Sequence, residues 1–545
     1  MSGGPLRAGI VAAIVAAPLV AQVAPQPQTP VFRASTRLVQ VNVVVHDRHG
    51  EPITSLKKED FTVLERGKPQ HIALFSINGP ASAAAPTPLP PHIFTNAVAA
   101  RGNVPTGVTV ILLDLVNTGF LDQQRARESV RAFLMQIQPQ DRVAIYTLGQ
   151  KGLVLLHDYS SDAASLVARL HDARGELSTT LDASTLNDDD QQDLIDMGLQ
   201  DVAEAEQRAA DFFTTNRIVN TLAAFEAIAH HLAGIPGHKS LVWVSGGIPL
   251  QIGFDEMPEA GGTFSNRDRR VFTPEMDAAA RALNDSGIAV YPVDARGLVP
   301  PVAFSSTARR APAKMPTIGQ ANANVDTMNE LAERTGGRAA YNTNDLGRAI
   351  RRAVDDGRMT YTLGYYSTDD RQDGKFRDIK VTVDRPGAEV RARKGYFALR
   401  PADTSAATRD REIREAVWSP LEATELPFDA RVDLLSDPPD TVNVFIQLKA
   451  GVVSFSKDGD RWKATLDAVF VQRDAQDKVL STAELETLPL SLTEDRFRQA
   501  SQQGLVFQHR VKREPSAAVL RIVVRDEPSG SVGSITVPLS ALRVP

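Results

Sequence analysis

The sequence has no cysteine among its 545 residues. This absence excludes disulfide bonds, a thiolate nucleophile and the common structural zinc sites, which all need the cysteine sulfur. It says nothing about the compartment, because an exported protein with large domains does not require disulfides. A chain of this length is expected to form roughly three or four domains, each stabilised by burial of its own core.

Two further absences narrow the function. There is no basic stripe, and 66 acidic residues outnumber 60 basic ones, so the mildly acidic surface should repel nucleic acid. No expected strand is followed by a P-loop or by the G-x-G-x-x-G fingerprint of dinucleotide-binding proteins. We therefore expect neither a nucleic acid nor a nucleotide as a partner.

Long apolar runs are also missing, except near the N-terminus. There Arg7 precedes an apolar run from Ala8 to Val23, and a stretch rich in proline and glutamine follows. The run is shorter than the roughly 20 apolar residues of a membrane-spanning helix. It predicts a signal peptide over residues 1–24, and hence an exported protein of the periplasm or the extracellular space. The alternative is an uncleaved anchor, which would be the protein's contact with a membrane.

Several stretches have the alternating pattern of β-strands. Apolar and polar residues alternate between residues 33 and 79, a stretch too short for an independent sandwich. Residues 80–104 are rich in proline and alanine and are interpreted as a linker. Strands return over residues 358–400, where they are expected to pair with the N-terminal strands. Residues 425–545 are expected to form a C-terminal β-sandwich.

Residues 105–357 alternate short apolar runs with amphipathic helices, which is typical of a Rossmann-type α/β domain with a mostly parallel sheet. The third expected strand follows the second after a very short turn, so this pair must be antiparallel and forms one edge of the sheet. The predicted fold is an α/β domain inserted in a β-framework and followed by a β-sandwich. The strands of the α/β domain are expected at residues 108–114, 142–148, 153–159, 240–246, 287–294 and 337–342.

An acidic stretch over residues 175–211, helical in its second half, interrupts this alternation. Three consecutive aspartates, Asp188, Asp189 and Asp190, are of the type that binds calcium. The glycine and the spacing of an EF-hand loop are absent. The pattern therefore favours a solvated helix start, where acidic side chains complement the helix dipole.

Ligands of open α/β sheets bind beyond the carboxyl ends of the strands. The first strand ends at Asp114, and the fourth ends at Ser245, which two glycines follow. A polar side chain at the end of a buried strand is either used in binding or satisfied by internal hydrogen bonds. In the second case the Asp114 carboxylate would accept N–H bonds from Asn117 and Thr118 and cap the following helix.

These passages resemble a known family. "GHKSLVWVSGGIP" and "GIAVYPVDARGL" look like parts of a von Willebrand factor type A (VWA) domain. "VVVHDRHGEPITSLKKEDFTVLE", "LAERTGGRAAYNTNDL", "YTLGYY" and "KGYF" are similar, in this order, to the VWFA-related acidobacterial domain family. The resemblance covers residues 37–399 and implies a VWA-like fold that binds a protein ligand.

The resemblance also implies a metal-ion-dependent adhesion site, in which oxygen ligands hold Mg²⁺ or Mn²⁺ and leave one position to a carboxylate of the partner. The match to its D-x-S-x-S motif is partial, since Asp114 fits the first position, Val116 replaces the first serine and Thr118 stands for the second. Ser245 and two glycines replace the usual Thr-Asp-Gly. The expected metal ligands of this degenerate site are Asp114, Thr118 and Ser245. A further loop threonine has three candidates, which are Thr214, Thr215 and Thr221.

Catalysis is not expected. Ser245 lies where a hydrolase nucleophile would lie, but Trp243 occupies the first glycine position of the G-x-S-x-G motif. His230 and His231 are adjacent and lack the spacing of a metal-binding pair. We therefore expect an exported, non-catalytic protein that uses the VWA-like domain for adhesion or protein-protein interaction. The alternatives are a serine hydrolase using Ser245 and a structural component of the cell envelope.

Overall fold

The structure is a computed structural model. It describes residues 38–78, 89–98, 107–173, 175–186, 188–252, 270–298, 318–369, 371, 373, 375–398, 406–435, 437, 440–449, 451–480 and 484–542. These residues all belong to one compact unit, Leu38–Pro545. The expected signal peptide, residues 1–24, lies outside the described residues. Among the described helices, none is both long and apolar enough to cross a membrane.

Two four-stranded antiparallel sheets form a β-framework from segments on both sides of the α/β domain. In the shared core, alternate residues of paired strands point the same way, so that Val41 lies opposite Leu363 and Val43 opposite Tyr361. The first sheet has the order β15-β1-β13-β4, with β1 Leu38–His46, β4 Ile72–Asn78, β13 Thr360–Tyr366 and β15 Glu389–Ala392. The second has the order β16-β14-β2-β3, with η1 Lys58–Asp60 before β2 Phe61–Glu65, then β3 Lys68–Gln70, β14 Phe376–Val383 and β16 Gly395–Phe397.

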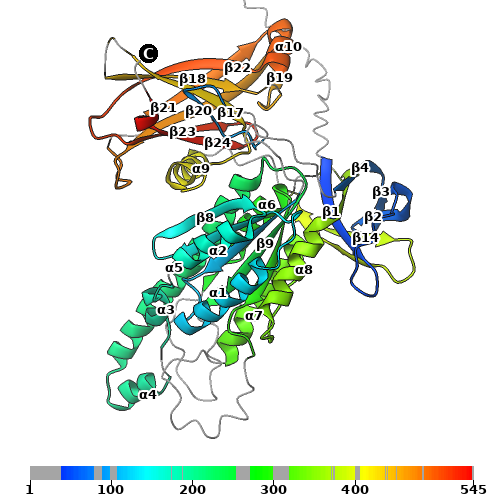
Figure 1. Cartoon of the computed structure of the whole chain (residues 1–545), viewed down its shortest axis with the longest axis vertical. Coiled ribbons are helices and arrows are strands. Elements are labelled where there is room, and N and C mark those ends of the chain that lie inside the picture. The colour runs from blue at the N-terminus through cyan, green and yellow to red at the C-terminus, as the bar shows by residue number, and fades with distance from the viewer. Residues whose placement is uncertain are drawn as a thin grey trace, which may run out of the picture. The chain divides into compact units, whose positions relative to one another are not determined.

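The α/β domain is built on a mostly parallel five-stranded sheet, as predicted (Figure 1). The strands β7 and β9 are buried along their whole length and β6 from Val108 onwards, which explains their apolar runs. The β7–β8 pair is antiparallel and forms one edge. The order is β12-β9-β6-β7-β8, with β6 Gly107–Asp114, β7 Val143–Gly149, β8 Gly152–Ser160, β9 His238–Ser245 and β12 Ile288–Asp294.

The strand expected at residues 337–342 is reduced to a single bridge between Ala340 and Val293. Ala340 donates its N–H to the Pro292 carbonyl and accepts the N–H of Asp294. A longer parallel ladder would next need an N–H from Pro292, which proline lacks. Asn342, with a φ of 52°, then turns the chain away. The sheet therefore has five full strands instead of the six that the sequence pattern predicts.

Helices cover both faces of this sheet and create two cores. One face is covered by α1 Phe120–Leu134, α2 Ala163–Asp172 and α8 Leu346–Arg358. The other is covered by α5 Gln200–Leu232, α6 Thr273–Asp285 and α7 Ile318–Thr335. Smaller elements are α3 Thr179–Ser184, α4 Asp188–Asp196, β10 Gln251–Ile252 and β11 Arg270–Val271.

The C-terminal region holds two further antiparallel sheets around a third core. One has the order β22-β18-β17-β5, with β5 Ile93–Thr95, β17 Phe428–Leu434, β18 Thr441–Leu448 and β22 Leu505–Lys512. The other joins β19 Ser456–Asp458, β20 Arg461–Arg473, β21 Glu484–Leu492, β23 Val519–Asp526 and β24 Val532–Pro538. The region also contains α9 Ala406–Trp418, α10 Glu494–Gln503 and η4 Leu539–Ala541.

Strand β5 lies within residues 80–104, which the composition predicts to be a linker only. The buried Asn96 after it donates to the carbonyls of Ala423 and Leu426 and accepts the N–H of Phe428. These bonds hold the segment against β17. A three-residue strand next to prolines leaves no periodic signal, so composition alone does not reveal it.

Candidate functional site

The carboxyl edge of the parallel sheet brings together the residues that the sequence analysis singled out. Asp114 is the last residue of β6 and Ser245 is the last residue of β9, and these strands are neighbours. The Ser245 hydroxyl donates to Asp114 Oδ2 at 2.8 Å. Thr118 joins them through its hydroxyl, which accepts the N–H of Gly246 at 3.1 Å. All three side chains are buried.

The Asp114 carboxylate accepts four hydrogen bonds. Oδ1 accepts the backbone N–H of Asn117 at 3.1 Å. Oδ2 accepts from the Asn117 amide at 2.8 Å, from the Trp243 indole at 3.0 Å and from Ser245. Burial raises the pKa of Asp114, and the bonds from Asn117, Ser245 and Trp243 act in the opposite direction. Of the two N–H bonds that the structural alternative for Asp114 predicted, from Asn117 and Thr118, the structure shows the one from Asn117. The helix α1 begins after Gly119, outside these bonds.

A buried cation completes this cluster. The Arg217 guanidinium from α5 donates to Asn117 Oδ1 at 2.7 Å, and Asn117 in turn holds Asp114. Burial lowers the pKa of Arg217 to about 10, while the Asp114 charge raises it, so the side chain is cationic at neutral pH. Asp114, Asn117 and Arg217 therefore form one buried chain of hydrogen bonds.

Thr221 is the candidate threonine that lies in the cluster. Its hydroxyl accepts from the Asn117 amide at 2.8 Å and donates to the Arg217 carbonyl at 2.8 Å. Thr214 and Thr215 lie one to two turns earlier on α5 and are partly exposed. The sequence analysis missed Arg217. The signal that marks it is an arginine one turn before Thr221, on the stripe that also buries Ile218, Leu222 and Phe225.

These residues do not fit Mg²⁺ or Mn²⁺ as a family site would hold them. Such ions need about six oxygen ligands, usually including carboxylates. Here the carboxylate of Asp114 is already used by four donors, and the hydroxyls of Ser245 and Thr118 each accept a backbone N–H. The Arg217 guanidinium supplies positive charge of its own. Among the described residues, no group of three or more acidic or histidine side chains could hold a metal ion.

Asp294 at the end of β12 does not add a ligand, because it is engaged locally. Its carboxylate accepts from the Arg296 guanidinium at 2.9 and 2.8 Å and from the Arg296 backbone N–H at 3.0 Å. Gly297 follows with a φ of 76°. The cluster thus orders its own loop.

Ser245 has no open path to a substrate. Its side chain is fully buried, and its hydroxyl accepts the N–H of Gly247 at 2.9 Å while donating to Asp114. His230 and His231 lie at the far end of α5. His230 contacts the Glu425 carboxylate at 2.7 Å, and His231 contacts the Glu422 carbonyl at 2.7 Å. Neither histidine serves as a base for Ser245.

Four large apolar side chains on segments attached to this edge of the sheet are exposed, and we call them the apolar rim: Phe120, Leu121, Leu177 and Leu298. Their side chains are between 40 % and 76 % exposed. Phe120 and Leu121 begin α1, directly after the loop that holds the cluster.

The other two members of the rim are attached to this helix end. Gln123 donates to the Glu176 carbonyl at 2.9 Å and accepts the Glu176 N–H at 3.1 Å, which places Leu177 beside α1. Arg125 donates to the Arg296 carbonyl at 2.7 Å, which brings Leu298 to the other side. The start of α1 and two separate loops therefore contribute to the rim.

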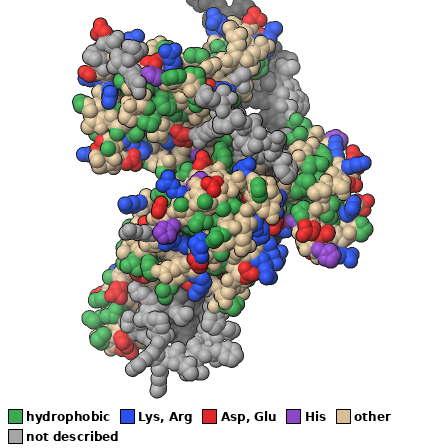
Figure 2. Space-filling model, viewed as in Figure 1, with side chains coloured by type: hydrophobic (Ala, Val, Ile, Leu, Met, Phe, Trp, Pro, Cys, Tyr) green, Lys and Arg blue, Asp and Glu red, His purple; other side chains and the backbone are tan. Residues whose placement is uncertain are grey.

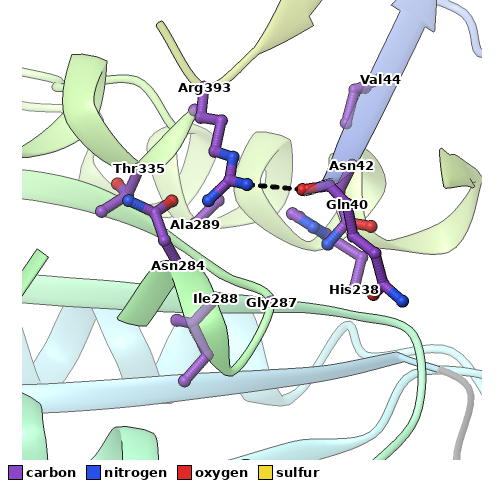
Figure 3. Close-up of a pocket in the computed structure, with 11 residues that line it drawn as sticks. Gln40, Asn42, Val44, His238, Asn284, Gly287, Ile288, Ala289, Thr335 and Arg393 are labelled. Carbon is purple, nitrogen blue, oxygen red and sulfur yellow. Dashed lines mark hydrogen bonds between the residues drawn. The ribbon is translucent and has the colours of Figure 1, made fainter. Parts of the chain in front are cut away.

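The opposite end of the sheet has a different character. His238, the first residue of β9, lines a small hollow that is partly open to solvent. Figure 3 shows His238 and Asn42 on one side of this hollow and Asn284 and Thr335 on the other. Burial lowers the pKa of His238 to about 4, and the neighbouring Lys239 acts in the same direction. Neither ring nitrogen of His238 has a hydrogen-bond partner among the described residues.

Comparisons with known proteins find no family model and no curated protein that matches the sequence. Partly similar solved structures include an aerotolerance-related membrane protein from Bacteroides fragilis, with 16% identity, covering 46% of this chain and 99% of that one, at a TM-score of 0.26. The SpRpn10 VWA domain has 10% identity, covers 46% and 97%, and has a TM-score of 0.20. The human COPII-coat protein Sec24c has 12% identity, covers 54% and 43%, and has a TM-score of 0.22. At these scores no property of those proteins transfers to this chain.

Proposed function

We propose that this chain is an exported, non-catalytic binding protein whose VWA-like domain engages a protein partner at the carboxyl edge of its sheet, without a metal ion. The observation that carries the proposal is the apolar rim, four large exposed side chains supplied by the start of α1 and by two loops. Clustered exposed apolar side chains mark protein-binding surfaces, because a partner that covers them removes apolar area from water. The export part rests on the signal-peptide pattern of residues 1–24.

The buried cluster supports the rim rather than contacting the partner. Asp114, Thr118 and Ser245 are too buried to touch another molecule. Their hydrogen bonds hold the loop after β6 against the loop after β9, and Gln123 extends this support to residues 175–177. A rigid backbone beneath exposed apolar groups lowers the entropy that binding must overcome.

Site-specific photo-crosslinking in the living cell tests the rim. A photoreactive amino acid replaces Leu121, and as a matched control the same residue replaces Val506, which is similarly exposed on β22. We expect a discrete protein adduct at 121 that Leu177→Ser and Leu298→Ser reduce at least threefold. An adduct that forms equally at both positions, or that survives both substitutions, contradicts binding at the rim.

The hydrolase alternative rests on the 2.8 Å contact between Ser245 and Asp114. A fluorophosphonate probe reacts with activated serines, and we expect it to leave the wild-type protein unlabelled. Labelling that disappears in Ser245→Ala would instead establish a nucleophile at this position. A chain that shows neither labelling nor crosslinks would favour the role of a structural component of the cell envelope.

A further inference from the structure

Helix α5 extends far beyond the sheet that it covers. Its 33 residues span about 50 Å at 1.5 Å per residue, but its contribution to the main core begins only at Ile218. The preceding part of α5 packs against α3 and α4 instead. We call residues 188–212, which comprise α4 and this first part of α5, the acidic arm (Figure 1).

A tight turn at the end of the arm exposes apolar side chains. Gly198, with a φ of 78°, joins α4 to α5 and lets the Leu199 N–H bond to the Leu194 carbonyl at 2.8 Å. Around this turn four apolar side chains, between 41 % and 65 % exposed, lie within eight residues; they are Ile195, Met197, Leu199 and Val202. Ala203 and Ala210 supply the buried contacts of α5 here. The larger apolar groups at the turn therefore face water.

The charge of the arm is strongly one-sided. Residues 188–212 contain nine acidic residues and one basic residue, Arg208, whereas the whole chain has a net charge of −6. Arg208 is already paired with Glu204 at 3.4 Å. Figure 2 shows the combination of hydrophobic and acidic side chains at this end of the protein, at the lower left of the view.

The combination of exposed apolar side chains and acidic charge indicates which kind of surface the arm could bind. Anionic lipid headgroups and nucleic acid would be repelled by the acidic side chains. A second copy of the arm would bring like charges together, which costs free energy at an interface. A surface that carries both cationic and apolar side chains complements the acidic charge and the exposed apolar groups of the arm. A basic amphipathic helix presents cationic and apolar side chains on adjacent faces.

We propose that the acidic arm is a docking site for a basic amphipathic segment of a partner protein, with its apolar side chains packed on the turn between α4 and α5 and its lysine or arginine side chains facing the surrounding carboxylates. The inference goes beyond the proposed function, because the arm shares no residue with the apolar rim. The two surfaces can be tested and can fail separately.

The experiment measures fluorescence anisotropy of labelled peptides with the full-length chain. The probe is an 18-residue helical peptide with lysines on one face and leucines on the other. One control peptide has glutamates in place of the lysines, and another has glutamines in place of the leucines. We expect the first peptide to bind at least tenfold more tightly than either control, with an affinity that falls as salt rises.

Two variants locate the binding. The combined change Met197→Ser, Leu199→Ser and Val202→Ser should weaken the basic amphipathic peptide at least tenfold. The combined change Asp193→Asn, Asp196→Asn and Asp201→Asn should weaken it and flatten the salt dependence. All six positions are exposed, so thermal melting should show that both variants remain folded.

A matched control changes exposed apolar residues elsewhere, with Leu485→Ser and Val506→Ser on β21 and β22, and should bind like the wild type. Leu121→Ser in the rim should also leave peptide binding unchanged. The inference is overturned if the arm variants bind as tightly as the wild type, or if the glutamate peptide binds equally well. A loss of binding in Leu121→Ser alone would move the site to the rim.

Discussion

Two pairs of buried polar residues at opposite ends of the parallel sheet are stabilised in different ways. At the carboxyl edge, Asp114 and Arg217 are both buried, but Asn117 links their charges. At the amino edge, His238 and Lys239 are equally buried, and burial lowers both pKa values, Lys239 to about 7. Asp114 and Arg217 are stabilised by hydrogen bonds through Asn117, whereas burial favours the neutral forms of His238 and Lys239.

This difference separates the cluster of Asp114, Asn117 and Arg217, which is held by internal hydrogen bonds, from His238 and Lys239, whose protonation depends on pH. The paired cluster is complete without a ligand, so it supports neighbouring loops such as those of the apolar rim. Burial and the neighbouring Lys239 both disfavour the charged form of His238, and the stability of the protein should therefore depend on pH in the range where His238 titrates. Substitutions that remove one partner at the carboxyl edge, or the titrating group at the amino edge, test this contrast.

The largest effect is expected from Arg217→Met. Removing the guanidinium leaves the Asp114 carboxylate buried without a cation, which costs about 3–5 kcal/mol in the free energy of unfolding of the α/β domain. The matched control is Arg208→Met on the same helix, because that side chain is exposed and its ion pair contributes about 1 kcal/mol or less. Urea unfolding, followed by tryptophan fluorescence in variants that keep Trp243 and carry Phe at positions 418 and 462, measures both.

A double variant sharpens the result. Asp114→Asn combined with Arg217→Met removes both charges and should recover part of the lost stability. If Arg217→Met is no more destabilising than Arg208→Met, the charges of Asp114 and Arg217 are not coupled. The hydrogen bonds through Asn117 then have no structural role.

An intermediate effect is expected from His238→Leu, and only in acid. The folded pKa of His238, about 4, lies below its unfolded value of 6.5. Between these values the unfolded chain binds a proton that the folded chain does not, so wild-type stability falls as the pH drops from 6.5 towards 4. The leucine variant escapes this loss and should exceed the wild type by about 2 kcal/mol at pH 4.5.

At pH 8 both proteins carry a neutral side chain at position 238, so their stabilities should differ little. Thermal melting at pH 4.5 and pH 8 measures the two differences. Lys239→Met serves as a second probe, because its depressed pKa predicts a gain that grows as the pH falls from about 10.5 to 7. Equal differences between wild type and His238→Leu at both pH values would show that His238 does not titrate in this range.

The comparison also shows what sequence reasoning could reach. Asp114 and Ser245 were predictable because each ends a buried strand, and strands of this order meet at one edge. Arg217 was not, since it lies 100 residues from Asn117 and its partner is set by tertiary packing. The strand expected at 337–342 is reduced to one bridge because Pro292 lies next to it, and only the topology of the sheet reveals that neighbour.

The smallest effect is expected from metal ions. Because Asp114 is saturated by four donors and Arg217 provides the local positive charge, EDTA and millimolar Mg²⁺ or Mn²⁺ should leave the melting temperature of the wild type unchanged. Asp114→Ala should melt at a lower temperature than the wild type, because the buried Arg217 cation then lacks a nearby negative charge. Its melting temperature should be equally insensitive to metal ions. A metal-dependent rise in the wild type that Asp114→Ala abolishes would mean that the cluster opens to bind the ion, and the carboxyl edge would then be the changeable end of the sheet rather than the rigid one.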